Sequence, residues 1–186
     1  MNKNAVIAAF KSYGWSIETD EVGDKIGLLN LPDRIVDVIP HLQRVKGKQQ
    51  LSILPTLSTR IFSDYCKAVD GRGENYTPLI RARKRILITS YELQYEDISH
   101  ISDSAIDWAQ EQDLNNAIQD HAALPTDAPG ARPVWHLASL AILGEVERLK
   151  FYQASFETGD RLGFVNYVTK EYIDRAVALA EGRTDF

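Results

Sequence analysis

Ile35-Val-Asp-Val-Ile-Pro-His-Leu-Gln-Arg-Val45, followed by the turn-like Lys46-Gly-Lys48, is the stretch that decides the fold class of this chain. Its β-branched and apolar side chains are typical of a strand. Proline cannot donate to a sheet ladder, so Pro40 indicates an edge or a bulge. After the turn, Leu51 and Ile53 fall on one face of a returning strand. The stretch therefore predicts an antiparallel hairpin.

Strand patterns continue on both sides of this hairpin. Residues 15–19 alternate apolar and polar side chains, which is the period of a half-buried strand, and residues 25–31 follow a turn as its hairpin partner. Pro55 marks another edge. Residues 79–95 are extended in character and form the longest predicted strand region. We expect a sheet of about four to five strands from the first half of the chain.

Helical patterns dominate the second half of the chain. Further signals mark helix ends: Ser58 or Thr59 as a cap, Gly71 as a stop, Ser104 with Asp107 as a capping box, and Pro133 as a helix start. The predicted helices span residues 2–13, 103–124, 134–156 and 165–181, and a short helix carrying Ile61, Phe62, Tyr65 and Val69 is expected between the cap and Gly71. The sequence therefore predicts an α+β fold, in which an antiparallel sheet from the N-terminal half packs with helices and the C-terminal half is mainly α-helical. We expect a single domain over residues 1–186, with a β-rich subregion 1–97 and a helical subregion 98–186.

Composition narrows the class of protein. The chain has 186 residues, of which 44% are hydrophobic, so it can bury a core without disulfide staples. Its one cysteine, Cys66, forms no internal disulfide and no cysteine-rich metal site. No secretory signal and no run of about 20 apolar residues occurs, so we expect a cytoplasmic protein that does not enter a membrane. The net charge of −5 argues against nucleic-acid binding.

Charge is distributed unevenly along the sequence. Residues 1–95 hold 14 of the 21 basic and 10 of the 26 acidic residues, whereas residues 96–186 hold 7 basic and 16 acidic residues. The first half is therefore net positive and the second half strongly negative. This asymmetry favours a protein partner with a basic surface, attracted by the acidic helices.

Arg81-Ala-Arg-Lys-Arg85 is the sharpest local feature. In an extended strand, Arg81, Arg83 and Arg85 project from one face at intervals of about 7 Å. Guanidinium groups bind carboxylates and phosphates through a planar set of donors, so the stretch predicts an anion-binding strand. Two plainer interpretations stay open: a solvated strand face, or a stripe that pairs with the acidic helices of the same chain.

No other pattern points to catalysis. The four histidines have no metal-ligand spacing, and the sequence contains no GxSxG, SxxK or phosphate-loop motif. Nothing near Cys66 in the sequence would activate its thiol, so we expect it to be structural. Pairs of carboxylates in the helical half are expected to be solvated charge. We therefore predict no catalytic residue, no metal site and no cofactor.

The expected function is that of a small, acidic, non-enzymatic protein-binding module. Immunity proteins that neutralise toxins and chaperones of secreted effectors share this general size, charge and class, although no motif links the chain to either group. The acidic residues expected to form the partner surface are Asp103, Asp107, Glu111, Asp113, Glu145 and Glu147. The alternative is an enzyme or small-ligand binder with a site of His136, Arg83 and a carboxylate brought together by folding. A concave pocket with converging ionisable groups would favour the alternative.

Overall fold

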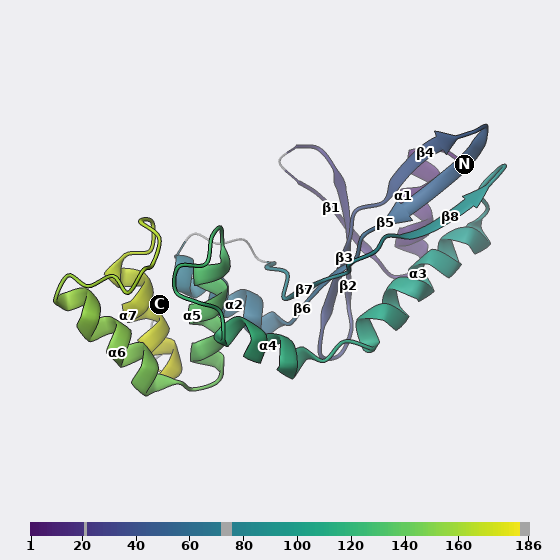
Figure 1. Ribbon diagram of the computed structural model, residues 1–186. Helices are drawn as coiled ribbons and strands as arrows, with labels where there is room; N and C mark the ends of the chain where they lie inside the picture. Colours follow the sequence, from purple (N-terminus) through teal and green to yellow (C-terminus); the bar gives the residue numbers. More distant parts are fainter. Residues whose placement is uncertain (21, 72–75, 183–186) are drawn as a thin grey trace. The chain divides into compact units, whose positions relative to one another are not determined.

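The computed structural model describes residues 1–20, 22–71 and 76–182, and it is an α+β protein as the sequence predicts (Figure 1). The helices are α1 (Lys3–Ser12), α2 (Arg60–Asp70), α3 (Tyr95–Gln110), α4 (Leu114–Ala122), α5 (Arg132–Ile142), α6 (Val146–Glu157) and α7 (Lys170–Ala180). The strands are β1 (Ser16–Thr19), β2 (Lys25–Asn30), β3 (Ile35–Val38), β4 (His41–Val45), β5 (Lys48–Ile53), β6 (Thr56–Ser58), β7 (Ile80–Arg81) and β8 (Ile86–Ser90). The strands pair antiparallel and come from the N-terminal half, and the C-terminal half is helical.

The chain forms two compact units, and each is built from two separate segments. Unit 1 comprises Met1–Ser58 and Ile80–Gln112, and unit 2 comprises Thr59–Leu79 and Asp113–Phe186. Unit 1 therefore contains the sheets with α1 and α3, and unit 2 contains the other helices. Counted this way, unit 1 has 11 basic and 12 acidic residues, and unit 2 has 10 basic and 14 acidic residues. The acidic α3 belongs to unit 1, so the charge difference between the units is smaller than that between the sequence halves.

Three segments of unit 1 each contribute a strand to both of its sheets. The larger sheet has the order β1-β2-β3-β6-β7, and the smaller has the order β4-β5-β8. Pro40 separates β3 from β4, and Pro55 separates β5 from β6. Neither proline can donate a ladder hydrogen bond, so the pairing breaks there and the strand direction changes. The Pro55 carbonyl instead accepts a hydrogen bond from the Ala82 amide at 3.0 Å, at the break between β7 and β8.

The end of α1 fixes the large aromatic residue of the unit 1 core. Gly14 has a left-handed backbone (φ 89°), and the amides of Gly14 and Trp15 bond back to the carbonyls of Lys11 and Phe10. This arrangement is a Schellman motif, which brings the residue after the glycine onto the last turn of the helix. Trp15 accordingly packs edge-to-face on Phe10 with ring centroids 5.5 Å apart, and its indole N–H donates to the Ser102 hydroxyl of α3 at 2.8 Å.

The prediction of one long strand region over residues 79–95 is wrong. β7 ends at Arg81, a bend occupies residues 82–85, β8 ends at Ser90, and α3 begins at Tyr95. The alternating pattern after Ser90 belongs to a turn in which Leu93 is buried and Tyr91 is 79% exposed. The Asp97 carboxylate accepts a hydrogen bond from the Gln94 amide at 2.8 Å, and this contact starts the helix.

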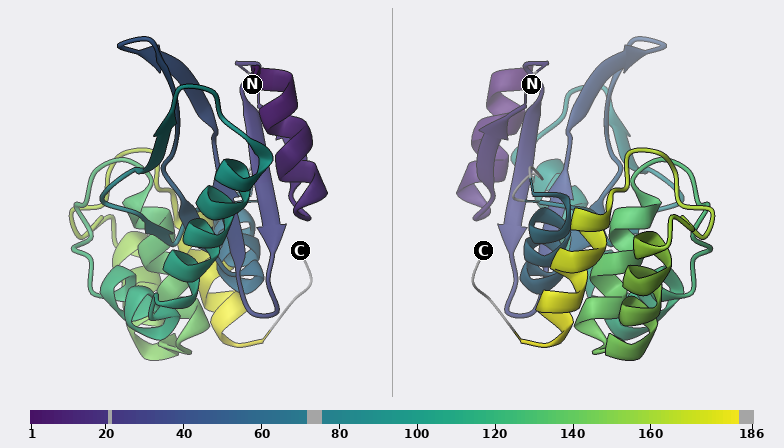
Figure 2. Two further views of the ribbon diagram at one scale, coloured as in Figure 1. Left: turned by 90° about the vertical axis from the view of Figure 1, so that its right-hand side faces the viewer. Right: turned by 90° about the vertical axis from the view of Figure 1, so that its left-hand side faces the viewer.

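Unit 2 is arranged around α5, which contacts α2, α4, α6 and α7 (Figure 2). The prediction of a single helix over residues 134–156 is wrong, because the segment forms two helices, α5 and α6. Gly144 (φ 70°) ends α5 in a Schellman motif. In that motif the Gly144 amide bonds to the Ala141 carbonyl and the Glu145 amide bonds to the Leu140 carbonyl. The chain then reverses into α6. The left-handed glycine is therefore what allows α6 to pack back on α5.

The single helix predicted over residues 103–124 is also two helices, α3 and α4. Asp113 begins α4 as its N-cap, with its carboxylate accepting from the Asn116 amide at 3.0 Å. Ser104 and Asp107 form no capping box, since Ser104 lies inside α3 and donates to the His100 carbonyl at 2.8 Å. None of the described helices is long and apolar enough to span a bilayer.

Candidate functional site

The six acidic residues expected to form one surface fall into two structural classes. Asp103, Asp107 and Glu111 lie exposed along α3 and its C-cap, in unit 1. The other three lie at helix starts in unit 2: Asp113 as the N-cap of α4, Glu145 as the N-cap of α6, and Glu147 in the first turn of α6. Carboxylates at those positions stabilise the helices through the helix dipole. The α3 carboxylates have no such role.

The basic residues lie in a kinked part of unit 1 rather than along one strand. Arg81 ends β7, Arg83 is exposed in the bend, and Arg85 donates to the Ser52 hydroxyl at 3.3 Å. In the described part of the chain, no ion pair joins these arginines to the acidic residues of α3. The kink means that the three guanidinium groups do not form the evenly spaced row that an extended strand would give. Their binding of an anion stays a prediction.

Asp37 is a titratable group that the sequence analysis did not single out. The strand register places Asp37 between Leu28 and Thr56, with Arg81 next in the same row across the larger sheet. Burial raises the pKa of the Asp37 carboxyl to about 6, against the lowering effects of the Thr56 hydroxyl and the Arg81 charge, and the Glu18 charge raises it further. Arg81 thus has an intramolecular carboxylate neighbour on a strand of the same sheet, and not on the acidic helices with which the sequence analysis considered a pairing.

We expect Asp37→Asn to stabilise unit 1 at pH 7.5 by about 1–2 kcal/mol and to have little effect at pH 4. The raised pKa means that the folded state holds a proton between pH 3.8 and about 6 that the unfolded state releases, so stability falls as pH rises through this window. Urea unfolding at both pH values, monitored through the NMR signals of the Val36 and Leu57 amides, measures the free energy of unfolding of unit 1. Asp24→Asn, at an exposed position of unit 1, is the matched control, and an equal effect of Asp37→Asn at both pH values would contradict the assignment.

His136, which the enzyme hypothesis uses as a base, is fully buried in unit 2. Its Nδ1 lies 3.2 Å from the His121 carbonyl and its Nε2 lies 3.2 Å from the Tyr152 hydroxyl. Arg148 Nε donates to that hydroxyl at 2.8 Å, so the Tyr152 proton is directed to Nε2 and the Nδ1 proton to the His121 carbonyl. Both ring nitrogens are therefore engaged within the core. Arg83 belongs to unit 1, and no described contact joins His136 to a carboxylate.

Burial lowers the pKa of His136 to about 4, and the Arg148 charge lowers it further, against the raising effect of the bonds to the His121 and Ala122 carbonyls. The imidazole is therefore neutral at pH 7. Since the unfolded chain takes up a proton near pH 6.5 and the folded chain does not, the contribution of this group to the stability of unit 2 is lost as pH falls from about 6.5 to 4.

We expect His136→Gln to flatten the pH dependence of unit 2 stability in this window, which amounts to at most about 3 kcal/mol. The variant is also expected to be less stable at pH 7, because a buried hydrogen-bonded ring is replaced by a smaller amide. Urea unfolding at pH 4.5 and 7, monitored through the NMR signals of unit 2 amides, gives the change in the free energy of unfolding with pH. His100→Gln, at an exposed position, is the control. A slope that is unchanged in His136→Gln would refute the buried neutral histidine.

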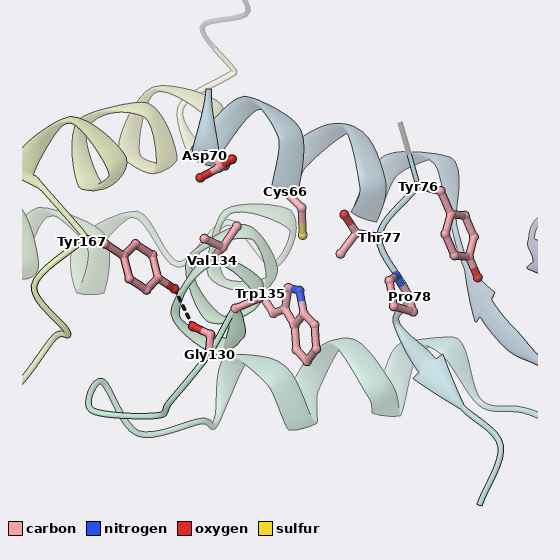
Figure 3. A pocket seen from close by; sticks show the side chains of 10 residues that line it. Cys66, Asp70, Tyr76, Thr77, Pro78, Gly130, Val134, Trp135 and Tyr167 are labelled. Atoms are coloured by element: carbon pink, nitrogen blue, oxygen red, sulfur yellow. Dashed lines mark hydrogen bonds between the residues drawn. The ribbon is translucent and has the colours of Figure 1, made fainter. Parts of the chain in front are cut away.

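A concave site does occur in unit 2, in a place that the sequence patterns did not indicate (Figure 3). Its volume is about 490 Å³, within the range of small-molecule pockets. The residues that line it are Cys66, Asp70, Tyr76, Thr77, Pro78, Gly130, Ala131, Val134, Trp135 and Tyr167. They come from the second half of α2, the segment before β7, the start of α5 and the connection before α7. Because four separate segments contribute, no local motif marks the site.

Helix ends position the pocket side chains. Thr59 caps the start of α2, and Gly71 ends it with φ 77°, which leaves Asp70 at the C-terminal edge of the pocket. Ala131 and Pro133 begin α5 and present Val134 and Trp135 from its first turns. Tyr167 donates to the Gly130 carbonyl at 2.6 Å, so its ring is fixed against the start of α5 (Figure 3).

The chemistry of the pocket is not that of a thiol enzyme. Cys66 is 3% exposed, and burial together with the nearby Asp70 charge raises the pKa of its thiol well above the ordinary range, against the effect of a hydrogen bond to Thr77. A protonated thiol is a poor nucleophile. Cys66 is therefore a buried, protonated thiol, and its structural role stays a prediction. No cluster of metal-ligating side chains is found among the residues the structure describes.

Comparisons with known proteins identify the family but supply no activity. No curated protein and no solved structure matches the chain. One family model matches residues 2–181, which is nearly the whole chain and includes both units. The chain therefore belongs to DUF6990, a family of unknown function.

Proposed function

We propose that this protein is a non-enzymatic binding module that engages a basic protein through α3. The observation that supports the proposal is the row formed by Asp103, Asp107 and Glu111, which are exposed and four residues apart, so they share one side of the helix. We call these three residues the α3 acidic row. Within the described part of the chain, no basic side chain forms an ion pair with them.

Two of the three residues of the α3 acidic row lie at the unfavourable C-terminal end of their helix. The last turn of α3 contains no basic residue, and Asp107 and Glu111 stand where the helix dipole is negative. Each such carboxylate costs about 0.3–1 kcal/mol, and like charges four residues apart add about 0.2–0.5 kcal/mol. Lysine at these positions would give a more stable helix. A cationic partner would remove the unfavourable interaction, which makes recognition of a basic surface the function that this row supports best.

Two biological settings fit such a module. As an immunity protein it would cover a basic toxin, such as a nuclease, and as an effector chaperone it would hold a basic effector before secretion. Both use charge attraction to speed association and need no catalytic group. The choice between them depends on what happens to the bound protein, inhibition of an activity or delivery to a secretion system.

The test compares a charge-reversed α3 variant with a matched variant in unit 2. We expect Asp103→Lys, Asp107→Lys and Glu111→Lys together to weaken binding of a basic partner at least tenfold and to reduce its salt dependence. The control reverses Asp120, Asp127 and Glu171, which are exposed acidic residues of unit 2 and give the same net charge change. Affinity purification with wild-type protein yields the partner, and titration with the purified partner gives the affinities.

The outcome is decided by the two variants together. Loss of binding in the α3 variant with retention in the control supports the proposal, and retention in both refutes the α3 surface. Equal loss in both shows attraction to net charge alone and also refutes it. Co-expression of the partner then distinguishes the settings: an immunity protein restores the growth of cells that produce the toxin, whereas a chaperone increases the secreted amount of the effector.

A further inference from the structure

The pocket of unit 2 combines aromatic walls with one carboxylate. Tyr76, Trp135 and Tyr167 contribute rings, and Asp70 is the one acidic residue among the lining side chains. Among the lining residues that the structure describes there is no lysine, arginine or histidine. Figure 3 shows Asp70 and Cys66 on α2, opposite Val134 and Trp135 of α5, with Tyr167 at one end.

One oxygen of the Asp70 carboxylate has no hydrogen-bond donor among the residues that the structure describes. The Tyr172 hydroxyl donates to one of its carboxylate oxygens at 2.7 Å, and no other described group hydrogen-bonds to the carboxylate. Arg175 is close by, but its guanidinium is bound to backbone carbonyls, that of Val69 at 2.8 Å and that of Asp70 at 3.1 Å, and it lies over the Tyr172 ring at 5.0 Å. The second carboxylate oxygen is therefore available to a donor on a ligand.

Tyr172 and Tyr167 extend this environment, with ring centroids 6.1 Å apart in an edge-to-face arrangement. Burial, together with the smaller effect of the Asp70 charge, raises the pKa of the Tyr167 hydroxyl, so this group stays neutral at physiological pH. Faces of aromatic rings attract cations, and this attraction adds to that of a nearby carboxylate. A positively charged ligand group near Asp70 would gain both contributions.

One feature of the pocket favours the opposite charge. Ala131 is the N-cap of α5, and a helix start carries a partial positive charge of about half an elementary charge. Asp70 carries a full negative charge and lies at the C-terminal end of α2, where the Arg175 guanidinium on the Val69 and Asp70 carbonyls offsets the partial negative charge of the helix end. Among the described lining residues Asp70 is the charged side chain, so a cation in direct contact with its carboxylate is favoured on the α2 side of the pocket.

We propose that the unit 2 pocket binds a small organic amine, with the ammonium group on Asp70 and an apolar or aromatic body between Trp135 and Tyr167. Val134, 8% exposed, and Pro78 supply apolar contact for that body. The volume of about 490 Å³ accommodates a molecule of this class. The proposal concerns unit 2 and is independent of the protein-binding role of α3.

The test uses three probes of one size and different charge: phenethylamine, 2-phenylethanol and phenylacetate. Their binding is followed by the indole N–H signal of Trp135 in ¹H–¹⁵N NMR spectra, assigned with Trp135→Phe. We expect phenethylamine to shift this signal saturably and to bind at least tenfold more tightly than phenylacetate. Asp70→Asn should abolish this preference while keeping the fold, because the amide oxygen still accepts from Tyr172. Asp64→Asn, at an exposed position on the same helix, should leave the preference intact.

The outcomes are distinct. Charge preference for the amine that depends on Asp70 but not on Asp64 supports the proposal. Phenylacetate binding as tightly as phenethylamine, or absence of a saturable shift with all three probes, overturns it. A preference that survives in Asp70→Asn overturns the assignment of the ammonium group. An intact spectrum of Asp70→Asn outside the pocket shows that the variant is folded, so loss of preference cannot be attributed to unfolding.

Discussion

The burial of α5 is the constraint on which unit 2 depends. Eight of its eleven residues are buried, so other helices must cover it on nearly every side. This requirement accounts for the left-handed Gly144, which returns α6 onto α5, and for the neutral state of His136, whose ring nitrogens are both engaged. Coverage ends at the start of α5, where Gly130 and Ala131 are exposed. The pocket lies there, opposite the end of α2.

The position of a carboxylate on its helix indicates which role it has in this protein. Asp113 caps the start of α4 and is part of the fold. Asp107 and Glu111 stand at the wrong end of α3 for stability, and Asp70 stands at the end of α2 with one oxygen that no described group hydrogen-bonds. Carboxylates that disfavour their own helix are the better candidates for binding an external cation. The cation proposed for the carboxylates of unit 1 is a basic protein surface, and the cation proposed for Asp70 of unit 2 is a small amine.

The sequence predicts local structure well where one residue determines it. Thr59 and Gly71 bound α2 as expected, and Pro133 lies at the start of α5. It fails where a tertiary contact decides: Pro55, expected at an edge, separates β5 from β6, and neither is an edge strand, whereas Pro40 does precede the edge strand β4. Alternation after Ser90 indicated a strand, yet the chain turns into α3 there. The pocket could not be predicted from the sequence, because it joins residues as distant as Cys66 and Tyr167. Their proximity depends on how α2, α5 and the connection before α7 pack.

Hydrogen exchange at constant pH, with and without saturating phenethylamine, tests most directly whether the pocket at the start of α5 is a binding site. If the amine binds there, amide exchange slows in the last turn of α2, in the first turns of α5 and around Tyr167, and exchange in α3 does not change. Slower exchange in α3, or no change at the start of α5, would contradict the amine-binding proposal.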